Sequence, residues 1–241
     1  MAKARRKIIQ AGRLWMAVQY TAIRGGNQSA KREAKAMIST PAREALNAKL
    51  SWQKLMLVLA ANFVSQDLVV TLTYRDGSLP PRREDADRLL SNFIRALRAS
   101  RKADGKDLIY VRITEGYHSD GRLHHHLIVN SSGNDFDTIR QLWKHGDNVD
   151  FEAFGGDGAE RWAKYLTKEP RIKGRKYVGD RTWRTSVHMK KPSHSYSFVD
   201  ADDDLSPPAG AWITDKTQCD NCYGRFCHMM AILPEQTQLN I

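Results

Sequence analysis

Three consecutive histidines near the middle of the chain carry the clearest chemical signal in the sequence. They stand in the segment GRLHHHLIV (121–129), whose apolar and β-branched residues predict a strand. Because side chains alternate between the faces of a strand, His124 and His126 share one face and His125 lies on the other with Leu123. Two neutral imidazoles at this spacing can bind one divalent ion. The pattern therefore predicts a metal site, with a histidine-rich surface strand as the alternative.

Glu115, at the end of the preceding predicted strand, is the candidate for a third ligand. If residues 116–121 form a six-residue hairpin loop, Glu115 pairs with Arg122 and lies on the same face as His124 and His126. Two histidines and one carboxylate leave coordination positions open for a substrate oxygen. Oxygen ligands and phosphate chemistry favour Mg²⁺ or Mn²⁺ over a closed zinc site. His125 is then predicted to pack in the core or to support the ligands from behind.

A tyrosine on a predicted helix is the second candidate for chemistry. The segment RWAKYLTKEP (161–170) predicts a helix that ends at its proline, with Tyr165 and Lys168 on one helical face. A tyrosine hydroxyl can attack phosphorus and form a covalent link, but with an ordinary pKa of about 10 it needs help to ionise. A lysine one turn away favours the phenolate. The alternative is a tyrosine that packs on the helix beside a solvated lysine.

These side chains must be positioned by a sheet and by helices that pack on it. Hydrophobic periodicity predicts helices and strands around them. The predicted helices are 50–63, 82–102, 135–144 and 158–168, and the predicted strands up to the tyrosine helix are 68–74, 108–114, 123–129 and 148–151. The order strand, helix, strand, strand, helix favours an α+β fold with a central antiparallel sheet flanked by helices over a doubly wound one.

The charge balance indicates what such a site would act on. The chain of 241 residues has 38 Lys and Arg against 27 Asp and Glu, a formal net charge of +11. An excess of this size attracts polyanions, of which nucleic acid is the usual one. A basic protein with no such partner is the alternative.

Taken in order, these motifs resemble those of the HUH endonuclease superfamily, and within it the rolling-circle replication initiators of phages and plasmids. The strand LVVTLTY (68–74) resembles the first motif of the family. Gly121, Arg122, His124 and His126 match its second motif, and Tyr165 and Lys168 match its third. Glu115 stands where these initiators often have the third metal ligand. His125 departs from the family pattern, which usually has an apolar residue there. Arg161 stands where some relatives have a second tyrosine, so the resemblance implies one catalytic tyrosine.

The resemblance implies a fold and a reaction. The fold is a central antiparallel sheet flanked by helices, related to the RNA-recognition fold. In the reaction, Tyr165 attacks a phosphodiester of single-stranded or hairpin DNA at a replication origin, which leaves a 5′-phosphotyrosine and a 3′-OH that primes synthesis. A transposase or relaxase of the same superfamily shares this chemistry, and a DNA-binding module without catalysis is a further alternative.

Basic residues near the two motifs are the predicted DNA contacts. They are Arg122, Lys164, Arg171, Lys173, Arg175 and Lys176. The sequence has no Gly-x-x-x-x-Gly-Lys-Ser/Thr motif, so no nucleoside triphosphate site is expected and a host helicase is expected to separate the strands.

The three cysteines are the remaining candidates for metal binding. Cys219, Cys222, Cys227 and His228 provide four ligands within ten residues, which suggests a structural Zn²⁺ site. The spacing is short, and Cys227 and His228 would point to opposite faces of a strand. A turn leading into a strand is therefore favoured over zinc.

The sequence predicts three segments: a basic, helical N-terminal extension (1–64), the nicking domain (65–200), and a C-terminal strand and loop segment packed on that domain (201–241). Apolar runs are too short for a membrane span or a signal peptide, so the expected location is the cytoplasm of a bacterial host cell.

Overall fold

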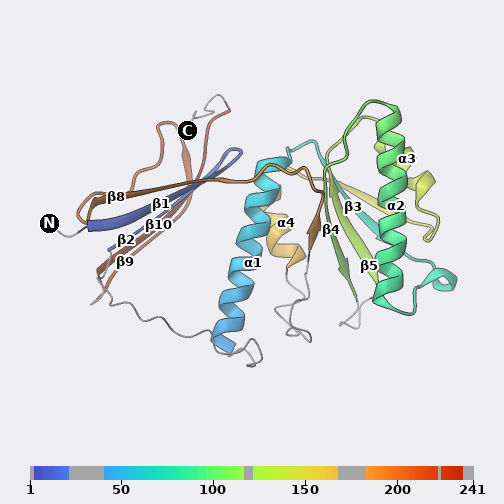
Figure 1. Cartoon of the computed structure of the whole chain (residues 1–241), viewed down its shortest axis with the longest axis horizontal. Coiled ribbons are helices and arrows are strands. Elements are labelled where there is room, and N and C mark those ends of the chain that lie inside the picture. Colours follow the sequence, from blue (N-terminus) through green and yellow to red (C-terminus); the bar gives the residue numbers. More distant parts are fainter. Residues whose placement is uncertain (1–2, 22–40, 117–121, 168–182, 222–223, 236–241) are drawn as a thin grey trace. The chain divides into compact units, whose positions relative to one another are not determined.

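The chain divides into two compact units. The computed structural model describes residues 3–21, 41–116, 122–167, 183–221 and 224–235 (Figure 1). One unit is continuous, Pro41–Met189, and the other combines the two ends of the chain, Met1–Thr40 with Lys190–Ile241. Each unit is built on one antiparallel five-stranded sheet. The predicted α+β class is therefore confirmed, although the sequence analysis expected one sheet and the described residues form two.

The continuous unit contains the candidate motifs. Its elements in chain order are α1 (Pro41–Asn62), β3 (Leu68–Thr73), a 3-10 turn η1 (Asp76–Ser78), α2 (Arg83–Ala103), β4 (Tyr110–Glu115), β5 (His124–Val129), α3 (Asp135–Leu142), β6 (Val149–Ala153), α4 (Gly158–Leu166) and β7 (Arg184–Thr185). The strands lie in the order β6-β3-β5-β4-β7, so the histidine strand β5 is central.

Helices cover both faces of this sheet, with α2 and α3 on one side and α1 and α4 on the other (Figure 1). The face toward α2 and α3 carries one large core, which includes Leu72, Leu127 and Trp143. On the opposite face of the same sheet, Val69, Ile113 and Ile128 are also buried. Burial on both faces explains why β3 and β5 are nearly continuous apolar segments interrupted by chemically distinctive residues.

The hairpin register between β4 and β5 differs from the prediction. Glu115 pairs with His124, two residues beyond the predicted partner Arg122. Gly116 makes this possible: its φ of 91° favours glycine, and a Cβ there would lie 2.5 Å from the carbonyl oxygen of Arg122. Because the shift is an even number of residues, Glu115 keeps the face that it shares with His124 and His126.

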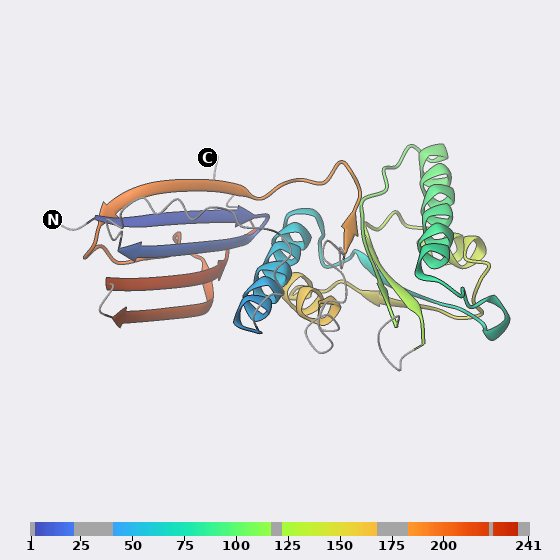
Figure 2. The same ribbon diagram turned by 60° about the horizontal axis from the view of Figure 1, so that its bottom comes forward.

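The terminal unit corrects the prediction of a helical N-terminal extension. Its strands are β1 (Lys3–Ala11), β2 (Leu14–Thr21), β8 (Ser193–Asp200), β9 (Trp212–Asn221) and β10 (Gly224–Ile232), arranged as β8-β1-β2-β10-β9 (Figure 2). β1 and β2 form a hairpin closed by Gly12 and Arg13, with Gly12 at φ 56°. The basic residues of β1 alternate between the two faces of the sheet, so a segment that was interpreted as a charged extension forms a strand.

The boundaries of the predicted segments also differ from this division. β8 lies within the predicted nicking domain, yet it pairs with β1 in the terminal unit. β9 and β10, from the predicted C-terminal segment, complete the same sheet through the pairing of β10 with β2. Pairing between the chain ends is a long-range contact that local sequence patterns do not encode. Among the described residues, no helix has the length and apolar character that a bilayer span requires.

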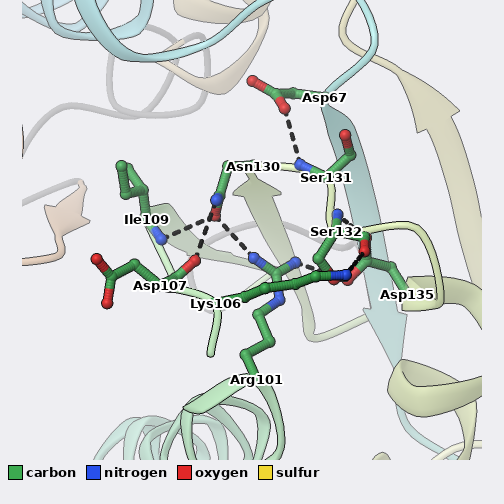
Figure 3. A network of polar contacts seen from close by, with 9 residues as sticks. All are labelled: Asp67, Arg101, Lys106, Asp107, Ile109, Asn130, Ser131, Ser132 and Asp135. Carbon is green, nitrogen blue, oxygen red and sulfur yellow. Dashed lines mark hydrogen bonds and ion pairs between the residues drawn. The ribbon is translucent and has the colours of Figure 1, made fainter. Parts of the chain in front are cut away.

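A buried polar network fixes the end of β5 against α2 and α3 (Figure 3). The guanidinium of Arg101, in α2, donates to Oδ1 of Asn130 (2.7 Å) and to Oδ1 of Asp135 (2.7 Å). Asp135, at the start of α3, also accepts from the backbone N–H of Ser132 at 2.6 Å. The Arg101 and Asp135 side chains are both only 3 % exposed. The network therefore joins three elements around one buried ion pair.

We predict that Arg101→Met lowers the free energy of unfolding by about 3–5 kcal/mol, because it leaves the Asp135 carboxylate buried without its cation. The matched control is Arg88→Met, on the same helix, where the arginine of the pair with Asp85 is 71 % exposed. That change should cost at most about 1 kcal/mol. Urea denaturation followed by circular dichroism measures both. Equal losses for the two variants would contradict the assignment.

Candidate metal centre and tyrosine helix

Glu115, His124 and His126 form a compact cluster on one face of the sheet. One ligand atom from each lies within 4.8 Å of the others. Nε2 of His124 is 3.5 Å and Nε2 of His126 is 3.6 Å from Oε2 of Glu115. The strands β4 and β5 create this arrangement because Glu115 pairs with His124 and His126 follows two residues later.

Hydrogen bonds orient both imidazoles toward the cluster. Nδ1 of His124 lies 2.8 Å from the carbonyl oxygen of Arg122, which only accepts, so Nδ1 carries the proton and Nε2 the lone pair. Nδ1 of His126 lies 3.1 Å from the hydroxyl of Thr71, its partner across the β3–β5 pairing. Such outer contacts set the tautomer and the ring orientation of metal-binding histidines.

The donor set fits a divalent ion. The two Nε2 atoms are 3.1 Å apart. Imidazole nitrogens that bind one ion at about 2.0–2.1 Å, with angles between 90° and tetrahedral, lie about 2.9–3.4 Å apart. Oε1 of Glu115 is buried without a hydrogen-bond partner among the described residues, which leaves an acceptor for a cation. The group can therefore bind a divalent metal ion.

The electrostatics of Glu115 favour the same conclusion. Burial by itself raises the pKa of this carboxyl, but hydrogen bonds with His124 and His126 outweigh burial and lower the pKa from 4.5 to about 2. The side chain is only 7 % exposed. A buried carboxylate that stays ionised is a ready ligand for a hard cation.

His125 lies on the opposite face and serves the core. Its Nε2 is 2.6 Å from the hydroxyl of Tyr74, and its Nδ1 is 2.9 Å from the hydroxyl of Thr114. Burial lowers the pKa of His125 to about 3, so the ring is neutral at physiological pH. This placement agrees with the packing role expected from strand alternation, and both ring nitrogens already have partners.

The tyrosine helix α4 brings Tyr165 against the cluster. The ring of Tyr165 meets the ring of His126 edge to face, with centroids 5.5 Å apart, and it meets Trp162 in the same way at 5.6 Å. Trp162 is buried and anchors the helix, whereas Tyr165 is 40 % exposed. Gly158 allows the helix to begin against Phe154, because a Cβ there would lie 2.7 Å from that ring. The exposed tyrosine is thus next to the ligand group.

The predicted DNA contacts that the structure describes are engaged within the protein. Arg122 donates to the carbonyl oxygen of Tyr74 and forms an ion pair with Asp76 at 2.5 Å. Lys164 pairs with Glu160 and lies 5.6 Å from the centre of the Trp52 ring. Five other predicted residues lie outside the described residues, namely Lys168, Arg171, Lys173, Arg175 and Lys176.

The described members of the cysteine group do not converge. Cys219 pairs with Phe226 across β9 and β10, so it shares a face with His228, whereas Cys227 points to the other face and is buried in the core. His228 instead lies 3.3 Å from Asp215. Cys222 lies outside the described residues. Strand alternation therefore prevents these residues from forming the four-ligand zinc site that was considered.

Sequence reasoning missed the polar residues that support the ligands. Thr71 and Thr114 stand in predicted strands, and each places a hydroxyl on a histidine ring. The available signal was their position: Thr71 alternates with buried Val70 and Leu72, so it must share a face with Val69. Which histidine faces it depends on the β3–β5 register.

Comparison with known families gives one match. Residues 67–170, less than half of the 241-residue chain, match the model of a replication-associated protein family, described by its member ORF2. The matched segment contains the ligand cluster and Tyr165, and the predicted resemblance to replication initiators of the HUH type is confirmed. Searches of curated proteins and of solved structures gave no match.

We predict that Thr71→Val weakens Mn²⁺ binding about 10- to 100-fold, because His126 loses the partner that orients its ring. Thr73→Val is the matched control, since this threonine is on the same strand and face but donates to the carbonyl oxygen of Asn148. Calorimetric titration with Mn²⁺ measures both, with Glu115→Gln as a variant that lacks a ligand. Equal affinity of the Thr71 and Thr73 variants would refute the orienting role.

Proposed function

We propose that this protein is a metal-dependent endonuclease that nicks single-stranded DNA through a 5′-phosphotyrosine intermediate and so initiates rolling-circle replication, a proposal that starts from the family match of residues 67–170. The observation that carries it is the contact between Tyr165 and His126, which joins a potential nucleophile to a potential metal ligand. Neither feature alone would distinguish an enzyme from a binding module.

The proposed reaction is a transesterification. The hydroxyl oxygen of Tyr165 attacks a DNA phosphorus, loses its proton, and forms a new oxygen–phosphorus bond. The bond from phosphorus to the 3′ oxygen breaks, and that oxygen takes up a proton to become a free 3′-OH. A divalent ion held by Glu115, His124 and His126, with Mg²⁺ or Mn²⁺ the proposed species, supplies positive charge at the phosphate oxygens.

The residues of this chain support the reaction in distinct ways. Buried Trp162 and the rigid helix α4 restrict where the Tyr165 hydroxyl can lie, and attack requires an approach of about 3–3.5 Å to phosphorus. The exposure of Tyr165 leaves it open to a substrate from solvent. Lys168 follows three residues later in the sequence, and we propose that its charge favours the phenolate.

Partners follow from the same proposal. The proposed substrate is single-stranded or hairpin DNA at an origin. Arg171, Lys173, Arg175 and Lys176 are proposed to contact its phosphates. A helicase from the host is proposed to open the duplex. A relaxase or transposase would use the same site chemistry and differ in the DNA that it selects.

We predict that Tyr165→Phe abolishes nicking and the covalent adduct while DNA binding persists, because only the nucleophilic oxygen is removed. Tyr110→Phe, on β4, is the control and should keep activity. The assay incubates the protein with oligonucleotides from the intergenic DNA beside its gene, and mass spectrometry maps the adduct. An adduct on Tyr177, or undiminished nicking by the Tyr165→Phe variant, would overturn the mechanism.

We further predict that EDTA abolishes nicking and that Mn²⁺ or Mg²⁺ restores it. The double variant His124→Ala with His126→Ala should lose at least about 100-fold in rate, because the charge that stabilises the reacting phosphate is lost with the ion. His188→Ala, an exposed histidine of the same unit, is the control. Full cleavage by the double variant would exclude the metal assignment.

A further inference from the structure

One face of the terminal sheet carries aromatic and basic side chains together. The sheet has two faces, and one of them packs on a core that includes Trp15, Cys227 and Met229. The opposite face presents the six residues that we call the aromatic–basic face: Arg5, Lys7, Tyr20, Tyr196, Phe198 and Phe226. They come from four adjacent strands, β8, β1, β2 and β10 (Figure 2).

The strand registers align these residues in rows. Phe198 pairs with Arg5, Arg5 with Tyr20, and Tyr20 with Phe226, so one row crosses four strands. In the next row Tyr196 pairs with Lys7. Residues that pair across antiparallel strands point to the same face, and the rows are about 6.7 Å apart along each strand.

The rings of this face are open to solvent. Phe198 is 67 %, Tyr196 63 %, Tyr20 39 % and Phe226 36 % exposed. Farther along the same face Ile9, Met16 and Met230 are buried, so exposure is confined to the aromatic end. Four large rings gathered at one exposed patch are characteristic of a binding surface.

Cations accompany the rings and are not neutralised within the protein. Arg5 lies 5.9 Å from the centre of the Phe198 ring, and Lys7 lies 5.6 Å from that of Tyr196. Neither forms an ion pair with a described residue. Their neighbour Arg6, on the other face, is bound to Gln19 and to the carbonyl oxygen of Asp204. The contrast shows that two of the three consecutive strand cations are left available.

Acidic groups are present only at the margins of this face. Asp200 forms an ion pair with Lys3 at 2.6 Å, and Asp215 lies 3.3 Å from His228. The aromatic rows themselves contain cations and no carboxylate. An anionic ligand with flat apolar groups is the chemical complement of such a surface.

We propose that the aromatic–basic face is a second nucleic-acid site, which binds single-stranded DNA by stacking bases on its rings and phosphates on Arg5 and Lys7. Aromatic side chains on a sheet beside basic residues provide both interactions that non-specific single-strand binding uses. The site adds a binding surface to the proposed function and shares with it only the DNA partner. It lies outside the family match of residues 67–170.

Other occupants fit the face less well. A second copy of this chain related by a two-fold axis would bring Arg5 and Lys7 against their own counterparts, which is unfavourable. Duplex DNA keeps its bases paired and stacked internally, so it cannot use the rings. An unpaired strand satisfies rings and cations together.

The test measures binding of a 20-nucleotide oligo-dT by fluorescence anisotropy, using the full chain with Tyr165→Phe so that no cleavage intervenes. Tyr196→Leu with Phe198→Leu keeps apolar bulk and removes the stacking surface. We expect a loss of at least about fivefold in affinity. Phe136→Leu, an exposed phenylalanine of the continuous unit, is the control and should bind like the parent.

A second arm removes charge. Arg5→Gln with Lys7→Gln should lower the slope of log affinity against log salt by about 1.4, or about 0.7 for each lost phosphate contact. Lys216→Gln, on the opposite face of the sheet, controls for loss of net charge. Crosslinking with iododeoxyuridine-substituted oligonucleotide should label peptides containing Tyr20, Tyr196, Phe198 or Phe226.

The outcomes separate this proposal from the nicking activity. Unchanged affinity of the folded leucine variant, or crosslinks confined to residues 41–189, would overturn the second site whatever the nicking assay shows. Loss of self-association in light scattering, with DNA affinity unchanged, would identify a protein interface instead. Ring-dependent binding by a chain that never nicks would support this site and count against the enzyme.

Discussion

Three adjacent histidines must be divided between two environments, and the register of β5 between β3 and β4 makes that division. A slip of one residue would place His125 among the ligands and bury His124 and His126 among apolar side chains. The pairing of β5 with both neighbours opposes such a slip through ladders of backbone hydrogen bonds. The position of Glu115, the partner of Thr71 and the ring that Tyr165 contacts all depend on the same register.

His125 links the core to the ligand strand. Because its ring nitrogens are engaged by Tyr74 and Thr114, and its pKa is lowered to about 3, the ring behaves as a neutral packing residue. Its ring also lies 5.9 Å from that of Trp143, in the core against α2 and α3. An apolar residue at this position could fill the space but could not accept or donate the two hydrogen bonds. The polar residue at this usually apolar motif position therefore has a structural explanation within the described residues.

The sequence predicted best where chemistry and periodicity coincide. Alternation along β5 and an even number of residues around the hairpin placed Glu115 with His124 and His126 although the assumed pairing was two residues off. Local patterns failed where the deciding contact is distant. Four cations among the residues of β1 resemble a disordered arm until β8 and β2 pair on either side. β9 was predicted to end at Thr214, because its second half is a polar edge strand that periodicity does not distinguish from a loop. The contacts of Thr71 and Arg122 depended on register that no single segment specifies.

The division of the chain suggests why the two units can serve different steps. The continuous unit holds every residue of the ligand cluster and the tyrosine helix, so its chemistry needs no contribution from the chain ends. The terminal sheet, in contrast, forms only when β1 pairs with β8 across the whole continuous unit. The entropy lost in closing such a connection grows only with the logarithm of its length, so a sheet can tolerate a folded domain between two of its strands. A terminal sheet kept in the same chain raises the effective concentration of any strand that it holds near the nicking unit. Tethering of this kind would matter most after cleavage, when the free 3′ end is no longer covalently attached to the protein.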